Sequence, residues 1–189
     1  MSHDVVVVGG GVIGLAIARS LVVDRTVLLI DREMPGRQAS WAAAGMLCPH
    51  SEADEDSAFL RLGLDSLEMY REYVEDLQRE VKIDLEYRSD GVLVLASTDE
   101  EMDAIRLRVA WQQDAGLNVR LLSADEALDL EPELTLDLRG ALFCPEEHQV
   151  RSRQLVEALK QSCLLRGVDI EDGAAVEEIL SWDDAVRGV

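Results

Sequence analysis

Short continuous apolar runs alternate with helically spaced apolar residues along this chain. Four consecutive valines at positions 5–8 and a second apolar run over 26–30 predict short strands buried in a parallel sheet. Residues 12–22 between them are typical of a helix. Over 57–80, apolar residues recur every three or four positions, which predicts a long amphipathic helix. The order strand, helix, strand favours the α/β fold class.

The middle and the end of the chain predict a second series of elements. Thr98 with Glu101 and Ser123 with Glu126 match the capping box that begins a helix, so helices are expected over 99–115 and from 124 to near Pro132. A helix over 152–166, capped by Ser152, should end at Gly167. Strands are expected over 91–95, 119–122, 168–171 and 176–182, then from 186 after a turn at 183–184.

Glycines directly after the first predicted strand carry the strongest chemical signal. Gly9 allows a tight bend, Gly11 lets backbone approach a pyrophosphate, and Gly14 lets the helix pack closely against the sheet. Asp31, at the end of the second strand, can accept hydrogen bonds from the hydroxyls of an adenosine ribose. Strand, glycine turn, helix, strand and carboxylate in this order predict a dinucleotide site. This fingerprint alone does not separate nicotinamide from flavin cofactors.

The segment 36–47 adds a polar turn, a possible N-cap at Ser40, several alanines and Gly45. Small residues allow backbone to approach a flat ring, although a tightly packed helix with Met46 and Leu47 in its core is the alternative. The series Arg37-Gln38-Ala39-Ser40 followed by Trp41, three alanines, Gly45 and Met46 resembles the D-amino-acid oxidase family of FAD-dependent oxidoreductases. Within that family it is most similar to the glycine oxidases of thiamine biosynthesis.

The resemblance implies FAD as the cofactor and places individual residues around it. It implies a Rossmann-like FAD-binding βαβ unit, with part of an inserted α+β substrate domain. Val12 and Ile13 would meet the pyrophosphate through backbone, and Asp31 and Arg32 would lie at the adenosine ribose. The backbone of Val176 would meet the adenine, although an ordinary buried strand valine is the alternative. The remaining positions, along the phosphates and ribityl chain and then beside the isoalloxazine, are Gln38, Ala39, Ser40, Ala44, Gly45 and Met46.

The same resemblance gives the expected organisation. Residues 1–50 and 140–189 would form an incomplete FAD-binding domain, and residues 51–139 part of the substrate domain. A family member is about twice as long, so we expect this chain to be the truncated N-terminal portion of an oxidase. On its own, the 189-residue chain is expected to be inactive. Exposed strand edges and apolar surface would favour a homo-oligomer.

The implied activity is oxidation of glycine or a related small amino acid, with hydride transfer to flavin. The imine would hydrolyse to glyoxylate and ammonia, and dioxygen would be reduced to hydrogen peroxide, so the amino acid and dioxygen are the expected partners. The family's substrate-binding arginine and tyrosine are expected after Val189, and no catalytic residue is assigned. The alternatives are an FAD-dependent D-amino-acid dehydrogenase and a non-catalytic nucleotide-binding fragment.

Charge narrows the choice of partners. The formal net charge is −20, from 38 acidic and 18 basic residues, which argues against nucleic acid and anionic membranes. An anionic cofactor is still compatible with this net charge. At physiological salt the Debye length is about 8 Å, so dissolved ions largely screen carboxylates scattered over the surface. No apolar run approaches the length of a membrane span, and the first strand follows Met1 closely, so the cytoplasm is the expected location.

The cysteines, the histidines and the carboxylates at positions 52–56 do not have the sequence spacing of a metal site. The cysteines are widely spaced and predict reduced thiols, with Cys163 packed on a helix face. The histidines are expected at the surface or in loops. The carboxylates before the long helix are interpreted as favourable charge at a helix start. These residues are Cys48, Cys144 and Cys163, then His3, His50 and His148, and then Glu52, Asp54, Glu55 and Asp56.

Overall fold

The computed structural model describes residues 2–134 and 137–189. The chain forms two compact units. The first unit contains the chain up to Gly45 together with residues 73–86 and 150–189. The second unit contains residues 46–72 and 87–149.

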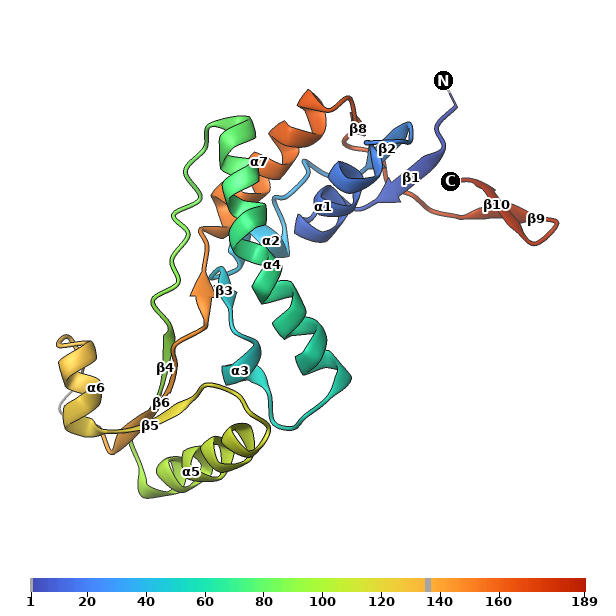
Figure 1. The fold of residues 1–189 in the computed structure, drawn as a ribbon. Coiled ribbons are helices and arrows are strands. Elements are labelled where there is room, and N and C mark those ends of the chain that lie inside the picture. Colours follow the sequence, from blue (N-terminus) through green and yellow to red (C-terminus); the bar gives the residue numbers. More distant parts are fainter. Residues whose placement is uncertain (1, 135–136) are drawn as a thin grey trace. The chain divides into compact units, whose positions relative to one another are not determined.

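A three-stranded parallel sheet forms the centre of the first unit (Figure 1). Strand β2 (Val27–Ile30) lies between β1 (Val5–Val8) and β8 (Asp169–Glu171). Helix α1 (Val12–Leu21) connects β1 to β2, and α7 (Ser152–Leu165) packs against α1. Leu15, Leu29 and Leu159 are buried in this core. The predicted α/β class, the first strand–helix–strand series and the helix ending at Gly167, where φ is 88°, are confirmed.

The first unit also holds short peripheral elements. Helix α2 (Ala39–Ala42) packs against α7. Strands β9 (Leu180–Trp182) and β10 (Ala185–Gly188) form a hairpin whose turn residues, Asp183 and Asp184, have φ values of 54° and 56°. The prediction of a strand from Val176 is wrong for its first half. Residues 174–179 make no strand pairing, and the Ala174 amide instead donates to the Asp31 carbonyl at 3.0 Å.

The second unit contains an antiparallel sheet in which β6 (Gly140–Cys144) pairs with β4 (Val92–Ala96) and β5 (Arg120–Ser123). Helix α5 (Asp99–Asp114) packs on this sheet, and α6 (Ala124–Leu130) follows β5 directly. Both predicted capping boxes are present, because each N-cap side chain accepts the N3 amide and each N3 glutamate accepts the N-cap amide. Two clusters of buried hydrophobic residues belong to this unit, one including Leu142 and the other including Ala141.

Shorter elements complete the second unit. Strand β3 (Met46–Leu47) pairs with β7 (His148–Gln149), and helix α3 (Pro49–Glu52) follows β3. Helix α4 (Ala58–Val81) begins in this unit and ends among residues of the first. Among the residues described, no helix is both long and apolar enough to cross a membrane.

The boundaries of the units differ from the predicted domains in two respects. Residues 46–50 and 140–149 belong to the second unit, and residues 73–86 belong to the first. Residues 73–86 belong to the first unit for a clear reason. Glu80, near the end of α4, accepts hydrogen bonds from Arg19 of α1, from Ser162 of α7 and from Arg166, the C-cap of α7. The assignment of cofactor and substrate roles to these parts of the chain stays a prediction.

Candidate functional site

The glycine turn between β1 and α1 depends on backbone that only glycine allows. Gly9 has a φ of 100°, and its amide donates to the Ile30 carbonyl at 2.8 Å. A Cβ built on Gly14 would lie 1.9 Å from the Gly9 carbonyl oxygen, and 3.4 Å from a Val7 methyl. Gly14 therefore permits close packing, as predicted, although its nearest neighbour is the turn rather than the sheet.

The start of α1 presents backbone donors without partners. Its N-cap, Gly11, supplies no side chain, and the Val12 amide donates to the Ser40 hydroxyl at 3.0 Å. Within the described parts of the chain, the amides of Gly11, Ile13 and Gly14 have no acceptor. Unpaired amides at a helix start favour an anion. The donor set therefore fits a diphosphate.

Asp31 is fixed beside this turn by backbone on both sides. Its Oδ2 accepts the Gly10 amide at 2.6 Å, and its Oδ1 accepts the Glu33 amide at 2.9 Å. Its own amide donates to the Glu171 carbonyl at 2.9 Å, which continues the pairing of β2 with β8. Each carboxylate oxygen retains a second lone pair, so the side chain can still accept ribose hydroxyls. Val176 lies half-buried two residues after Ala174, whose amide donates to Asp31.

The structure changes the interpretation of Ser40 and Gln38. Ser40 is the second residue of α2, whose N-cap is Gln38, so the prediction that Ser40 caps a helix is wrong. Its hydroxyl accepts the Val12 amide instead, which ties α2 to the glycine turn. The Gln38 side-chain amide donates to the Glu33 carboxylate. Ala39, Ala44 and Arg32 are exposed.

Gly45 is required by contacts within the protein. Its φ is 85°, and a Cβ there would lie 1.8 Å from the Val150 carbonyl oxygen. The Val150 amide donates to the Gly45 carbonyl at 2.9 Å. The glycine is thus explained without a ligand, and its place beside a flavin ring stays a prediction. Met46 follows in β3 with 48% of its surface exposed.

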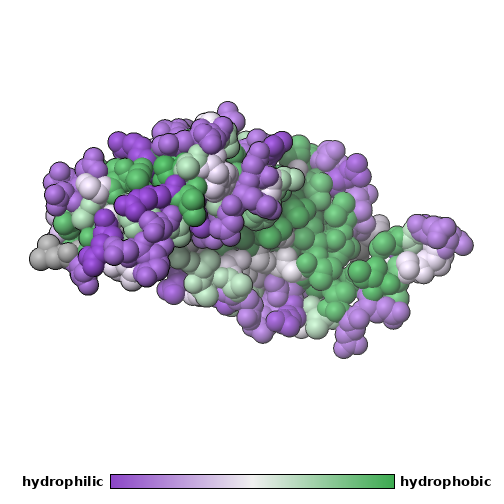
Figure 2. Space-filling model, turned by 90° about the horizontal axis from the view of Figure 1, so that it is seen from below, coloured by the Kyte–Doolittle hydropathy of each residue, from purple (hydrophilic) through white to green (hydrophobic). Residues whose placement is uncertain are grey.

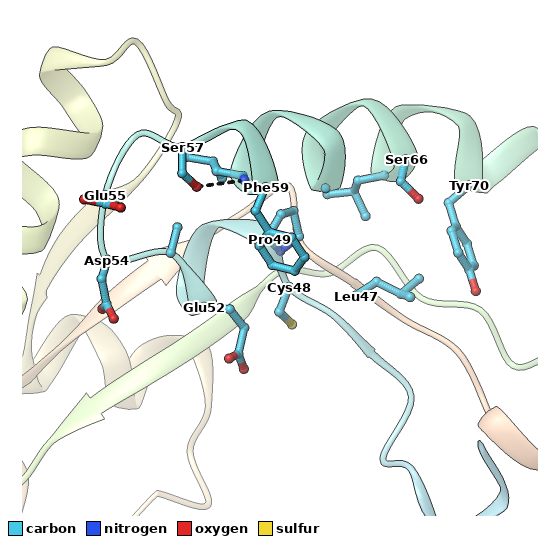
Figure 3. Close-up of a pocket in the computed structure, with 14 residues that line it drawn as sticks. Leu47, Cys48, Pro49, Glu52, Asp54, Glu55, Ser57, Phe59, Ser66 and Tyr70 are labelled. Atoms are coloured by element: carbon cyan, nitrogen blue, oxygen red, sulfur yellow. Dashed lines mark hydrogen bonds between the residues drawn. The ribbon is translucent and has the colours of Figure 1, made fainter. Parts of the chain in front are cut away.

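Figure 3 shows a pocket of about 380 Å³ built wholly from residues 47–70 of the second unit. Leu47, Pro49 and Phe59 give it an apolar lining, and carboxylates of the loop after α3 also line it. None of its lining residues is basic, so it offers no cation for the carboxylate of an amino acid. None of the predicted cofactor residues lines it either.

A buried polar cluster in the second unit was missed by sequence reasoning. His50 is only 2% exposed, so the prediction of a surface or loop histidine is wrong for this residue. Glu147, fully buried, accepts the Ser51 amide at 2.7 Å and lies 3.8 Å from His50 Nδ1. The Gln112 side-chain amide donates to the His50 carbonyl at 2.6 Å. Isolated polar residues give no periodic signal, so only their partners reveal such a cluster.

The three cysteines are free and buried. Burial, followed by the charge of Glu147, raises the pKa of both Cys48 and Cys144 to about 12. These thiols are therefore neutral near pH 7 and poor nucleophiles. The Cys163 thiol donates to the Leu15 carbonyl at 3.3 Å, consistent with a packing role. No group of His, Cys, Asp or Glu in the described ranges is placed to hold a metal ion.

A parallel βαβ unit with an open glycine turn and a carboxylate at the end of its second strand defines a dinucleotide-binding protein. The model of the DAO family, described as FAD dependent oxidoreductase, matches residues 4–189. The chain therefore belongs to the DAO family of FAD-dependent oxidoreductases.

Similar proteins include several glycine oxidases. The Geobacillus kaustophilus enzyme is 34% identical over 95% of this chain and 48% of its own length. The bifunctional protein ThiO/ThiG of Trichormus variabilis is 32% identical over the whole chain and 28% of its own length. The crystal structure of glycine oxidase from Bacillus cereus has a TM-score of 0.90 at 26% identity, covering 98% of this chain and 50% of that one. The chain thus spans about half the length of the glycine oxidases it matches.

These comparisons confirm the predicted family, fold class and cofactor class. They do not test individual residues. The placement of each residue around FAD stays a prediction, which the open amides and the fixed Asp31 support.

Proposed function

We propose that this chain supplies the FAD-binding part of an oxidase that acts on glycine or a related small amino acid, in thiamine biosynthesis. The observation that carries the proposal is the set of unpaired amides at the start of α1, beside a carboxylate held at the end of β2. Family membership and the similarity to glycine oxidases support the choice of cofactor and substrate class.

Each proposed contact uses a group described above. The amides of Gly11, Ile13 and Gly14 would hold the diphosphate, and the Asp31 carboxylate would accept the ribose hydroxyls. The backbone of Val176 would meet the adenine. Val12 is also proposed at the diphosphate, through its backbone, and Arg32 beside Asp31 at the ribose. The positions proposed along the phosphates and ribityl chain and then beside the flavin ring are Gln38, Ala39, Ser40, Ala44, Gly45 and Met46.

The chemistry divides between the cofactor and the chain. When bound, FAD would supply the acceptor for a hydride from the α-carbon of the amino acid, with dioxygen as the proposed final electron acceptor. The residues described here bind and orient the cofactor, because such a reaction depends on alignment more than on a protein nucleophile. The helix terminus contributes about 0.3–2 kcal/mol. Micromolar affinity requires about 8 kcal/mol, so contacts to the adenine and the flavin ring must supply most of it.

The cofactor part of the proposal is tested by titrating the 189-residue chain with FAD and following flavin fluorescence and the visible absorption band. Asp31→Ala removes the ribose acceptor and the anchor of the Gly10 amide, so we expect FAD to bind at least about tenfold more weakly. Asp129→Ala is the matched control, because Asp129 is an exposed carboxylate on α6. Absence of FAD binding, or equal weakening by both variants, would contradict the proposal.

The substrate part requires the remainder of a catalytic site. We suggest a hybrid in which this chain replaces the matching N-terminal part of the Geobacillus kaustophilus glycine oxidase. The hybrid should form hydrogen peroxide when glycine is added and lose this activity with Gly11→Val, which fills the diphosphate cradle. A hybrid that binds FAD, passes electrons to a quinone and makes no peroxide would favour a dehydrogenase instead.

A further inference from the structure

Two arginines stack on a single tryptophan next to Ser40. The guanidinium carbon of Arg37 lies 3.9 Å from the ring centroid of Trp41, and that of Arg153 lies 5.2 Å from it. The Arg153 Nε also donates to the Trp41 carbonyl at 3.3 Å. We call these three residues the Trp41 stack. All of them belong to the first unit.

The charge of the Trp41 stack is not neutralised by the protein. In the parts of the chain that the structure describes, no carboxylate lies within ion-pair distance of Arg37 or Arg153. Other arginines of this chain, such as Arg61 and Arg166, do pair with carboxylates. Two like charges on one ring repel each other, and a nearby anion would relieve the repulsion. The pair therefore points to an anionic ligand.

Helix α2 connects the stack to the glycine turn. Ser40, directly before Trp41, accepts the Val12 amide of α1 at 3.0 Å. The Ser152 hydroxyl donates to the Ala43 carbonyl at 2.6 Å. Ser152 was expected to cap α7, but the N-cap is Arg151 and no side chain caps it, so this hydroxyl fastens α2 instead. One short helix thus carries both the Ser40 contact and the two-arginine platform.

We propose that Arg37 and Arg153 are an additional charge pair for the diphosphate of the dinucleotide, with Trp41 as the platform that holds both guanidiniums. This inference rests on the proposed function, because it assumes that a dinucleotide binds at the glycine turn. Guanidinium groups suit phosphate oxygens, and a stacked side chain loses less freedom on binding than a free one. The pair would supply local positive charge in a protein whose formal net charge is −20.

The test compares ADP with adenosine by isothermal titration of the 189-residue chain. In the double variant Arg37→Gln with Arg153→Gln, ADP should bind about 5- to 20-fold more weakly at low salt, and adenosine within about twofold of the wild type. The loss for ADP should shrink towards twofold at about 0.5 M NaCl, because salt screens exposed charges. Lysine at both positions should recover part of the ADP affinity, because it restores the charge but not the planar guanidinium that stacks on Trp41. Arg187→Gln is the matched control, because Arg187 stacks on Trp182 at 5.8 Å in the β9–β10 hairpin.

The outcomes separate this inference from the proposed function. If the wild-type chain does not bind ADP, both are overturned. If the wild type binds ADP and the double glutamine variant binds it equally well, only the charge pair is overturned. Equal losses for ADP and adenosine, or an equal loss in Arg187→Gln, would also overturn it, because they indicate a purely structural stack. Thermal unfolding of each variant, including the lysine pair, verifies that the compared proteins are folded.

Discussion

At the scale of single residues, the backbone itself requires glycine at several positions of the candidate site. Gly9 needs a positive φ, and Gly14 needs space beside the Gly9 carbonyl. Gly45 needs a positive φ and also space beside the Val150 carbonyl. The requirement for glycine at position 45 can be tested without a ligand, because the atom that excludes a side chain there is the Val150 carbonyl oxygen.

We predict that Gly45→Ala destabilises the protein much more than Gly167→Ala. Both glycines have nearly the same φ, 85° and 88°, but only Gly45 has an atom within 4 Å of the added Cβ. The left-handed backbone should cost about 1–2 kcal/mol in either variant. The overlap with Val150 should add about 1–3 kcal/mol in Gly45→Ala. Urea unfolding measures both free energies, and equal losses would show that Val150 moves away freely.

The glycine turn and Asp31 could be predicted from the sequence because each is recognised by its position directly after a predicted strand. The sequence could not show that Ser40 bonds to Val12, or that His50 is buried against Glu147. These contacts join residues distant in the chain, and a serine or histidine has the same appearance in a sequence whether it is solvated or enclosed.

At the scale of secondary structure elements, a charged network joins three helices of the first unit. Glu80 of α4 accepts hydrogen bonds from Arg19 of α1 at 2.9 Å, and from Ser162 of α7 and its C-cap residue Arg166, both at 2.7 Å. Burial raises the pKa of Glu80, but the hydrogen bonds from Arg166, Ser162 and Arg19 outweigh it and hold the pKa at about 2. The network therefore requires the ionised carboxylate.

We predict that Glu80→Gln lowers the free energy of unfolding by about 1–3 kcal/mol near pH 7, because the arginines lose a charged acceptor. The folded pKa lies below the ordinary value of 4.5, so this stability is present above that value and is lost as the pH falls towards 2. The difference between wild type and variant should shrink over that range in unfolding curves. Glu75→Gln, an exposed change on the same helix, should show little effect at any pH. A difference independent of pH would contradict the network.

Elements were predictable where local signals define them. Both capping boxes, the end of α7 at Gly167 and the β9–β10 turn depend on a few adjacent residues. The short strands β3 and β7 exist because they pair with each other, which no local pattern announces. The strand predicted from Val176 failed for the same reason, since its first half has no partner to pair with.

At the scale of the whole molecule, much apolar surface is exposed. Figure 2 shows several hydrophobic areas at the surface, interspersed with hydrophilic residues. Ile13 is 74% exposed, and Trp182 and Val186 of the hairpin are 57% and 69% exposed. Strands β1 and β8 are the outer strands of their sheet in the described chain. Apolar surface and open strand edges favour association.

We predict that the isolated chain associates in a concentration-dependent manner in sedimentation velocity experiments. This measurement tests the expectation that the chain forms a homo-oligomer. Raising the salt concentration from about 0.05 to 0.5 M NaCl should strengthen the association, because it screens repulsion between copies of net charge −20. Maltose or another neutral osmolyte at equal osmolality should not reproduce the salt dependence. A single monomeric species at high concentration and high salt would contradict the prediction.

The central claim is that the open amides at the start of α1 bind a diphosphate, and amide hydrogen exchange measures this most directly. The exchange rates of Gly11, Ile13 and Gly14 are compared by nuclear magnetic resonance with and without ADP. We predict that ADP slows all three by at least about tenfold, with Gly116 and Gly173 as unaffected reference amides. Saturation with ADP that leaves these three rates unchanged, while amides elsewhere become protected, would contradict the account.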